Sequence, residues 1–115
     1  MTYEEIESEG KKYPVRYGFW ALNQFCKVCG LTLADLGKLE SQMQPEHAIG
    51  LVWAGLKDGH RKAKLSFDLS LDDIADLIDE DAQLITKCMT VFGKHQQNDS
   101  KTEKKNNRKQ TKGRK

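Results

Sequence analysis

The feature that most limits the fold is a run of nine residues, Ala48 to Leu56, that carries no charge. Pro45 precedes the run, and proline suits the first turn of a helix because the N–H that it lacks would have no partner there. A helix that is apolar all round is normally central and buried. Gly50 and Ala54 are small and four residues apart, so a neighbouring helix could approach closely. Because a bilayer span needs about 20 residues, we expect a small globular domain built round this helix.

The charge of the chain is divided between two unequal parts. Residues 94–115 hold seven Lys and two Arg against two acids, Asp99 and Glu103, which gives a net charge of +7. Because the whole chain carries +2, residues 1–93 carry −5. From Lys94 onward there is no apolar residue, so the segment cannot offset its ordering entropy. We predict a folded domain over residues 1–93 and a disordered basic tail over residues 94–115.

Periodicity and capping residues predict that the domain is mainly α-helical, with four to five helices after a short N-terminal β-hairpin. The hairpin is expected over residues 3–17, with a turn at Glu9–Lys11 and Pro14 in an edge position. The first helix is expected over residues 19–29, ended by Gly30 in the left-handed conformation.

Further patterns place the remaining helices. Thr32 is expected to cap a short helix, with Leu33, Leu36 and Leu39 pointing inward. The segment from Asp58 to Ser66 is interpreted as a polar loop after the apolar helix. A further helix is expected after Ser70, which caps it through Asp73, and the last helix is expected to end at Gly93.

Cys26 and Cys29 form a CxxC pattern that could belong to a redox or zinc protein. The pattern falls in the last turn of a predicted helix, where the negative end of the dipole disfavours a thiolate. No second ligand pair accompanies it, so we interpret both residues as small core residues, with redox or zinc chemistry as the weaker alternative. The odd number of cysteines and the absence of a secretory signal indicate reduced thiols in a cytoplasmic protein.

Two features suggest a protein-binding surface. Trp20 lies off the apolar face of its predicted helix, so it either packs on the hairpin or is exposed as an interface anchor. The helix after Ser70 has one acidic face, which is a solvated surface or a docking face for a basic partner. The candidate partner-binding residues are Trp20, Asp72, Asp73, Asp76 and Glu80.

Other classes of function have less support in the sequence. We find no phosphate-binding loop, nucleophile elbow or paired acid–base residues, so we predict no enzyme and no catalytic, cofactor or metal site. The basic tail could attract nucleic acid through counterion release, but it has no aromatic residue for base stacking. A nucleic-acid-associated accessory protein, binding without sequence specificity through the tail, is therefore the main alternative.

The order of several segments resembles the tail assembly chaperones of long-tailed bacteriophages and prophages. The similarity covers about residues 10–92 and is carried by the segments Tyr13–Tyr17, Ala21–Cys26, Gly30–Leu36, Leu51–Lys57 and Leu71–Asp79. The CxxC pattern is a departure from the family.

The resemblance implies a helical protein of the host bacterial cytoplasm that is absent from the mature virion. Such a chaperone binds the long tape-measure protein, keeps its apolar helices soluble and helps to recruit tail-tube subunits during virion assembly. The implied partners are thus the tape-measure and tail-tube proteins, with self-association as a further possibility and no membrane. The family has no catalytic residues that could be transferred to this sequence.

Overall fold

The computed structural model describes the backbone of residues 3–104 and, apart from Glu40, the side chains up to Lys94. Within residues 3–104 an N-terminal hairpin is followed by helices, of which α2 and α3 are single turns where the sequence predicts one short helix. The elements are β1 (Glu4–Ser8), β2 (Lys11–Val15), α1 (Phe19–Cys29), α2 (Leu33–Leu36), α3 (Leu39–Gln42), α4 (Pro45–Ala63), α5 (Leu71–Glu80) and α6 (Gln83–Lys104). The predicted fold class, a mainly helical domain with a short N-terminal hairpin, is confirmed.

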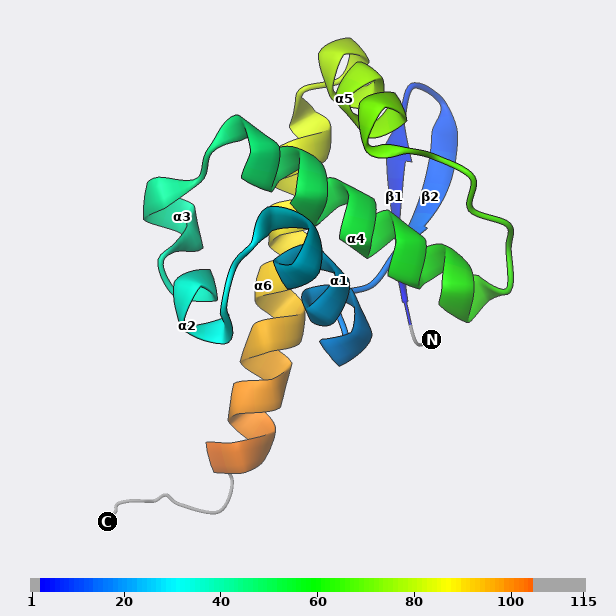
Figure 1. Cartoon of the computed structure of the whole chain (residues 1–115). Coiled ribbons are helices and arrows are strands. Elements are labelled where there is room, and N and C mark those ends of the chain that lie inside the picture. The colour runs from blue at the N-terminus through cyan, green and yellow to red at the C-terminus, as the bar shows by residue number, and fades with distance from the viewer. Residues whose placement is uncertain (1–2, 105–115) are drawn as a thin grey trace.

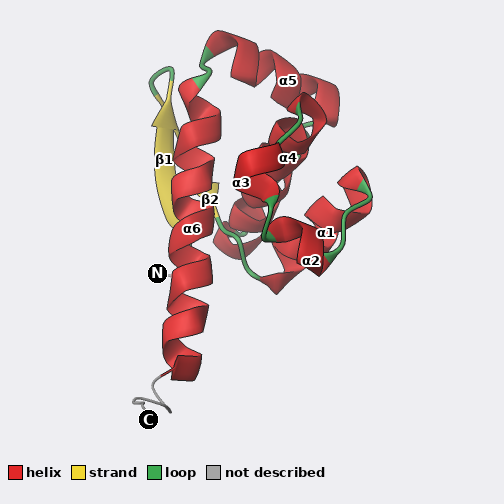
Figure 2. Cartoon of the chain, turned by 90° about the vertical axis from the view of Figure 1, so that its left-hand side faces the viewer, coloured by secondary structure: helices red, strands yellow, loops and turns green. Residues whose placement is uncertain are grey.

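The hairpin is antiparallel, with Ile6 opposite Tyr13 and Glu5 opposite Pro14. Glu9 and Gly10 form its turn and both have positive φ, +53° and +80°, as a two-residue hairpin turn that follows the strand twist requires. Figure 2 shows β1 on one side of α6, helices α1 to α4 on the other, and β2 passing behind α6 towards them. The hairpin therefore covers a side of the core that the helices leave open.

Local capping fixes α1 and α2 where the sequence predicts them. Gly30 ends α1 in the left-handed conformation, at φ +67°, and its N–H donates to the carbonyl of Cys26. Thr32 and Asp35 form a reciprocal capping box at the start of α2. The expectation that Leu33 points inward is wrong, because its side chain is 60% exposed. The turn that follows Gly30 leaves this first residue of α2 outside the core, which Leu39 enters instead.

Helix α4 is the centre of the domain, as its uncharged sequence predicts. It packs against α1, β2, α5 and α6, and it crosses the middle of the molecule in Figure 1. The predicted close approach occurs at Gly50, where a Cβ atom would lie 2.5 Å from Cys29 Sγ on α1. At Gly59 a Cβ atom would collide with the backbone of Pro14 on β2. The backbone N–H of Arg16 also donates to the carbonyl of Gly55, at 3.0 Å, so β2 ends directly on α4.

The predicted polar loop from Asp58 to Ser66 is wrong over its first two thirds, because α4 continues to Ala63. The polar residues of this part do not break the helix, since Asp58 is buried and paired with two arginines. Lys64 ends the helix in a left-handed conformation, and Leu65 donates back to the carbonyl of His60.

Helix α6 completes the core with Leu84, Cys88 and Val91, all buried. Its Phe92 ring meets Tyr17 edge to face at 5.4 Å, and the Tyr17 hydroxyl donates to the carbonyl of Leu51 at 2.7 Å. The structure differs from the predicted helix end at Gly93, because α6 continues to Lys104 and projects from the domain in Figures 1 and 2.

Gly93 does not adopt the positive φ that would end the helix. Glycine within a helix costs only about 1 kcal/mol relative to alanine, so the helix can continue through this residue. The predicted disorder of the basic tail lies, for residues 105–115, outside the described residues.

Candidate protein-binding surface

One face of α4 remains partly exposed along the length of the helix. It is formed by residues spaced three or four apart, which places them on one stripe of a helix. We call this surface the α4 stripe, and its members are Glu46, Ile49, Trp53, Lys57 and Arg61. Ile49, Trp53 and Lys57 are half-buried, whereas Glu46 and Arg61 are exposed. At 1.5 Å per residue, the stripe is about 22 Å long.

Helix α1 lies beside the stripe and runs antiparallel to α4. At one end the Trp20 ring lies against Arg61, whose guanidinium carbon is 4.3 Å from the ring centroid. At the other end the Cys29 thiol lies 3.6 Å from the carbonyl of Glu46. Trp20 is half-buried, and its ring contacts the side chains of Lys57 and Arg61 on α4.

Two indole rings and two cations alternate at the Trp20 end. The ammonium of Lys57 lies 4.5 Å from the centroid of the Trp53 ring and 6.0 Å from that of Trp20. Such contacts are favourable because a cation is attracted to the negative face of an aromatic ring. The arrangement keeps both tryptophans and both positive charges at the same end of the α4 stripe.

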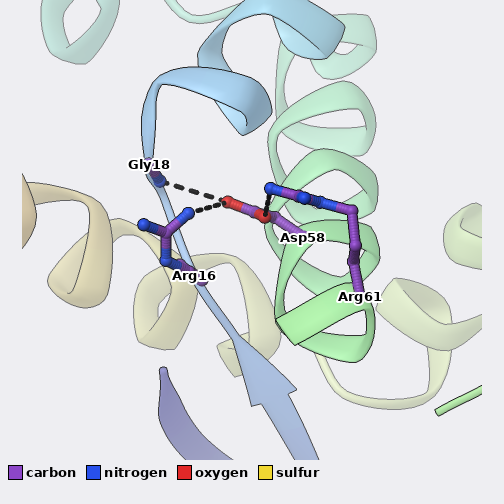
Figure 3. Close-up of polar contacts among 4 residues, drawn as sticks. All are labelled: Arg16, Gly18, Asp58 and Arg61. Atoms are coloured by element: carbon purple, nitrogen blue, oxygen red, sulfur yellow. Dashed lines mark hydrogen bonds and ion pairs between the residues drawn. The ribbon is translucent and has the colours of Figure 1, made fainter. Parts of the chain in front are cut away.

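Arg61 at this end is held by the fully buried carboxylate of Asp58, and Figure 3 shows Asp58 with Arg16, Gly18 and Arg61 around it. Asp58 accepts hydrogen bonds from Arg16 and Arg61, each at 3.0 Å, and from the backbone N–H of Gly18 at 3.2 Å. Gly18 is the residue that immediately precedes α1 and offers no side-chain cap of its own. The Asp58 carboxylate thus fixes both the start of α1 and the position of the Arg61 guanidinium against Trp20.

At the opposite end, the stripe opens into a groove between α1 and α5 of about 280 Å³. Its apolar lining comes from three helices, with one carboxylate from α4 and one from α5. We call it the α1–α5 groove, and it is lined by Val28, Cys29, Glu46, Ile49, Leu71, Asp72 and Ala75. Val28 and Leu71 are 40% and 38% exposed, so apolar surface is open to a partner there.

The four predicted acidic residues are all exposed on α5, but they do not form one site with Trp20. Asp72 lines the groove, whereas Asp73 closes the capping box by accepting the N–H of Ser70 at 2.9 Å. Asp76 and Glu80 follow Asp72 along the outer face of α5. Trp20 lies at the far end of the α4 stripe, so the stripe is what connects the two predicted features.

Sequence reasoning missed the residues of α4 that make this connection. The i, i+4 spacing of Trp53, Lys57 and Arg61 was a usable signal, but it was lost because the helix was expected to end before Asp58. Glu46 gives a weaker signal, since an acid in the first turn of a helix is common for dipole reasons alone.

A second hollow, of about 290 Å³, lies on the other side of α1. It is apolar apart from one amide and is lined by Phe19, Leu22, Asn23, Cys26, Leu31 and Leu33. Phe19 is 73% exposed, the largest exposure among the large hydrophobic residues described. Nothing charged lines this hollow, so it offers contact area without indicating what it would contact.

The cysteines are free thiols in three different environments. Burial is the main cause that raises the pKa of Cys26 and Cys29, which are half-buried at the end of α1. Cys88 is fully buried in α6, and burial raises its pKa to about 12. Within the described residues, no three His, Cys, Asp or Glu side chains come together as a potential metal site.

Comparisons with protein-family models, with curated proteins and with solved structures find no match to this chain. None of the helices in the described part of the chain combines the length and the apolar character that a membrane crossing needs.

Proposed function

We propose that this chain is a non-catalytic binding protein of the tail assembly chaperone type, which holds helical segments of a tape-measure protein in the bacterial cytoplasm. In this role it keeps the client soluble and helps to recruit tail-tube subunits. The observation that supports the proposal most directly is the α1–α5 groove, where open apolar surface lies next to two carboxylates.

An apolar groove between helices is suited to the apolar face of an amphipathic helix, because a few side chains at i, i+3/i+4 and i+7 spacing fill it. Ile49 lines the groove, and the half-buried side chain of Trp53 extends the apolar surface along α4 beyond it. A client helix can therefore make contact over several turns. The resemblance in the order of the sequence segments supports the same class of protein.

The proposal predicts that a gene for a very long helical protein lies immediately downstream. The test is co-expression of this chain with that protein. Replacing Val28 and Leu71 together by Gln removes apolar contact from the groove without changing any charge. We expect the wild-type chain to co-purify with the client and the double variant to lose at least tenfold in affinity, since central apolar anchors dominate such interfaces.

Leu65→Gln is the matched control, because Leu65 is 55% exposed in the loop after α4 and does not line the groove. It should bind as the wild-type chain does. The proposal fails if the wild-type chain does not retain the client, or if both variants retain it equally well.

A nucleic-acid-associated function remains the second candidate, because cations beside aromatic rings at Trp20 and Trp53 are also a feature of single-strand binding surfaces. Its test is binding to a random duplex and to oligo(dT) at moderate salt. Affinity that survives moderate salt and depends on the two tryptophans would favour this candidate over the chaperone.

A further inference from the structure

We propose that the surface formed by the α4 stripe and the α1–α5 groove selects a client helix by its charge pattern. The occupant is an amphipathic helix with a basic side chain at the groove end, apolar side chains in the middle and an acidic side chain about eleven residues away at the Trp20 end. This inference rests on the proposed function, because it takes the partner to be a helix of a client protein.

The groove end is negative. Glu46 and Asp72 come from different helices and both line the groove, so their carboxylates flank the same apolar surface. Asp72 makes no ion pair with any other described residue, and Glu46 has only the His47 ring at 3.9 Å. A basic side chain of the client would find two exposed carboxylates here.

The Trp20 end is positive. Lys57 lies over two indole rings and, among the described residues, has no carboxylate within ion-pair distance. Arg61 gives one of its nitrogens to Asp58 and remains partly exposed. An acidic side chain of the client could bind both cations without displacing the buried carboxylate.

The distance between the two ends fixes the spacing in the client. Glu46 and Lys57 are eleven residues apart, which is three turns and about 16 Å along α4. A second helix lying along the stripe has the same rise, so its two charges must also be about eleven residues apart on one face. Ile49 and Trp53 lie between, where the client presents apolar side chains.

Charge complementarity of this kind acts mainly through specificity and the rate of association. Selection of one client helix therefore needs both a negative end and a positive end on this surface. A purely basic helix would be attracted to the groove and repelled at Lys57, whereas a purely acidic helix would be repelled at Glu46.

The experiment uses the full-length chain and synthetic helical peptides with one apolar face. The first peptide carries Lys at position i and Glu at position i+11. Two companions carry Lys or Glu at both positions, and a fourth carries the charges on the opposite face. Both tryptophans of the chain lie at the proposed surface, so their fluorescence reports binding directly.

We expect the Lys–Glu peptide to bind about five- to tenfold more tightly than any companion at low salt, and the difference to shrink at high salt. Lys57→Glu should abolish the advantage of the Lys–Glu peptide over the Lys–Lys peptide, because Arg61 remains at that end. Asp72→Lys should abolish its advantage over the Glu–Glu peptide, because Glu46 remains in the groove. Lys62→Glu is the matched control, because Lys62 is exposed on the opposite face of α4 and should leave the preference unchanged.

Circular dichroism and melting temperature confirm that each variant is folded before binding is compared. If the client protein co-purifies but all four peptides bind equally, the charge pattern is wrong and the proposed function stands. If neither the client nor any peptide binds, the proposed function and the charge pattern are both wrong. If Lys57→Glu keeps the wild-type preference, or if oligo(dT) displaces the Lys–Glu peptide in a way that depends on Lys57, the inference is overturned.

Discussion

Asp58 holds a carboxylate with no exposed side-chain surface at the junction of β2, α1 and α4. Burial of an ion pair is not stabilising in itself, because the cost of removing charges from water can equal the attraction. Removing one partner is destabilising, however, since the remaining polar groups lose their counterpart. Because three donors converge on Asp58, its carboxylate is necessary for the stability of the fold.

We expect Asp58→Asn to lower the free energy of unfolding by about 2–4 kcal/mol, because the amide turns a donor towards an arginine that is already a donor. Urea denaturation measures the loss. Asp68→Asn, at an exposed acid in the loop before α5, should change the stability by less than about 0.5 kcal/mol. Equal stabilities of the two variants would show that the Asp58 pairs contribute nothing.

The three thiols should differ in reactivity because only a thiolate reacts with an alkylating reagent. A pKa of about 12 leaves roughly one Cys88 in ten thousand as thiolate at pH 8, and the side chain is buried as well. Cys26 and Cys29 should be alkylated first, although more slowly than in the unfolded chain. Mass spectrometry of the native protein, compared with a urea-unfolded control, measures the order.

The raised pKa of Cys88 determines whether the stability of the fold rises or falls with pH. The neutral thiol contributes its full stability below the ordinary value of 9, and this stability is lost as the pH rises from 9 towards 12. Native alkylation of Cys88 as fast as Cys26 at pH 8 would contradict the assignment of Cys88 to the core.

Among the elements, α4 depends on small residues where other elements touch its backbone. A methyl group at Gly59 would collide with the backbone of Pro14, which cannot move away as a side chain could. We expect Gly59→Ala to cost about 3 kcal/mol or more, in spite of the better helix propensity of alanine.

Gly93→Ala is the matched substitution, since nothing lies within 4 Å of the added methyl group in α6. It should raise the free energy of unfolding by about 0.5–1 kcal/mol. Thermal melting of the two variants measures both effects, and a stable Gly59→Ala protein would show that β2 does not pack on α4 as described.

Elements set by local rules could be predicted from the sequence. The hairpin turn at Glu9–Gly10, the end of α1 at Gly30 and the caps at Thr32 and Ser70 each depend on a few neighbouring residues. The extent of α4 could not, because Asp58 is polar by itself and its burial depends on partners that include Arg16 and Gly18, which are distant in sequence.

For the whole molecule, the candidate site was predictable only in its separate parts. Trp20 off the apolar face and the acids of α5 were both visible as patterns. The α4 stripe that joins them was not, since it depends on how α1 packs against α4 and on where α5 begins. The exposed apolar surface at Phe19 and Leu33 was not predictable either, because the periodicity of the leucines indicates a buried Leu33.

All buried apolar residues described lie before Phe92, and Lys94 makes the last described ion pair, to Glu4 at 3.3 Å. We therefore expect a chain truncated after Lys94 to fold, with a melting temperature within a few degrees of that of the full chain. Differential scanning calorimetry measures this. A cooperative loss of stability on truncation would show that the second half of α6 belongs to the folding unit.

The central position of α4 also has a consequence for synthesis on the ribosome. Its contacts with β2 and α1 join residues within the first 63 of the chain, so this part can associate while the rest is still being translated. The core is then still open, because Leu84, Cys88 and Val91 of α6 have not yet emerged. A released chain that ends near residue 82 would leave the surface around Tyr17 and Leu51 exposed, because α6 is the element that completes the core.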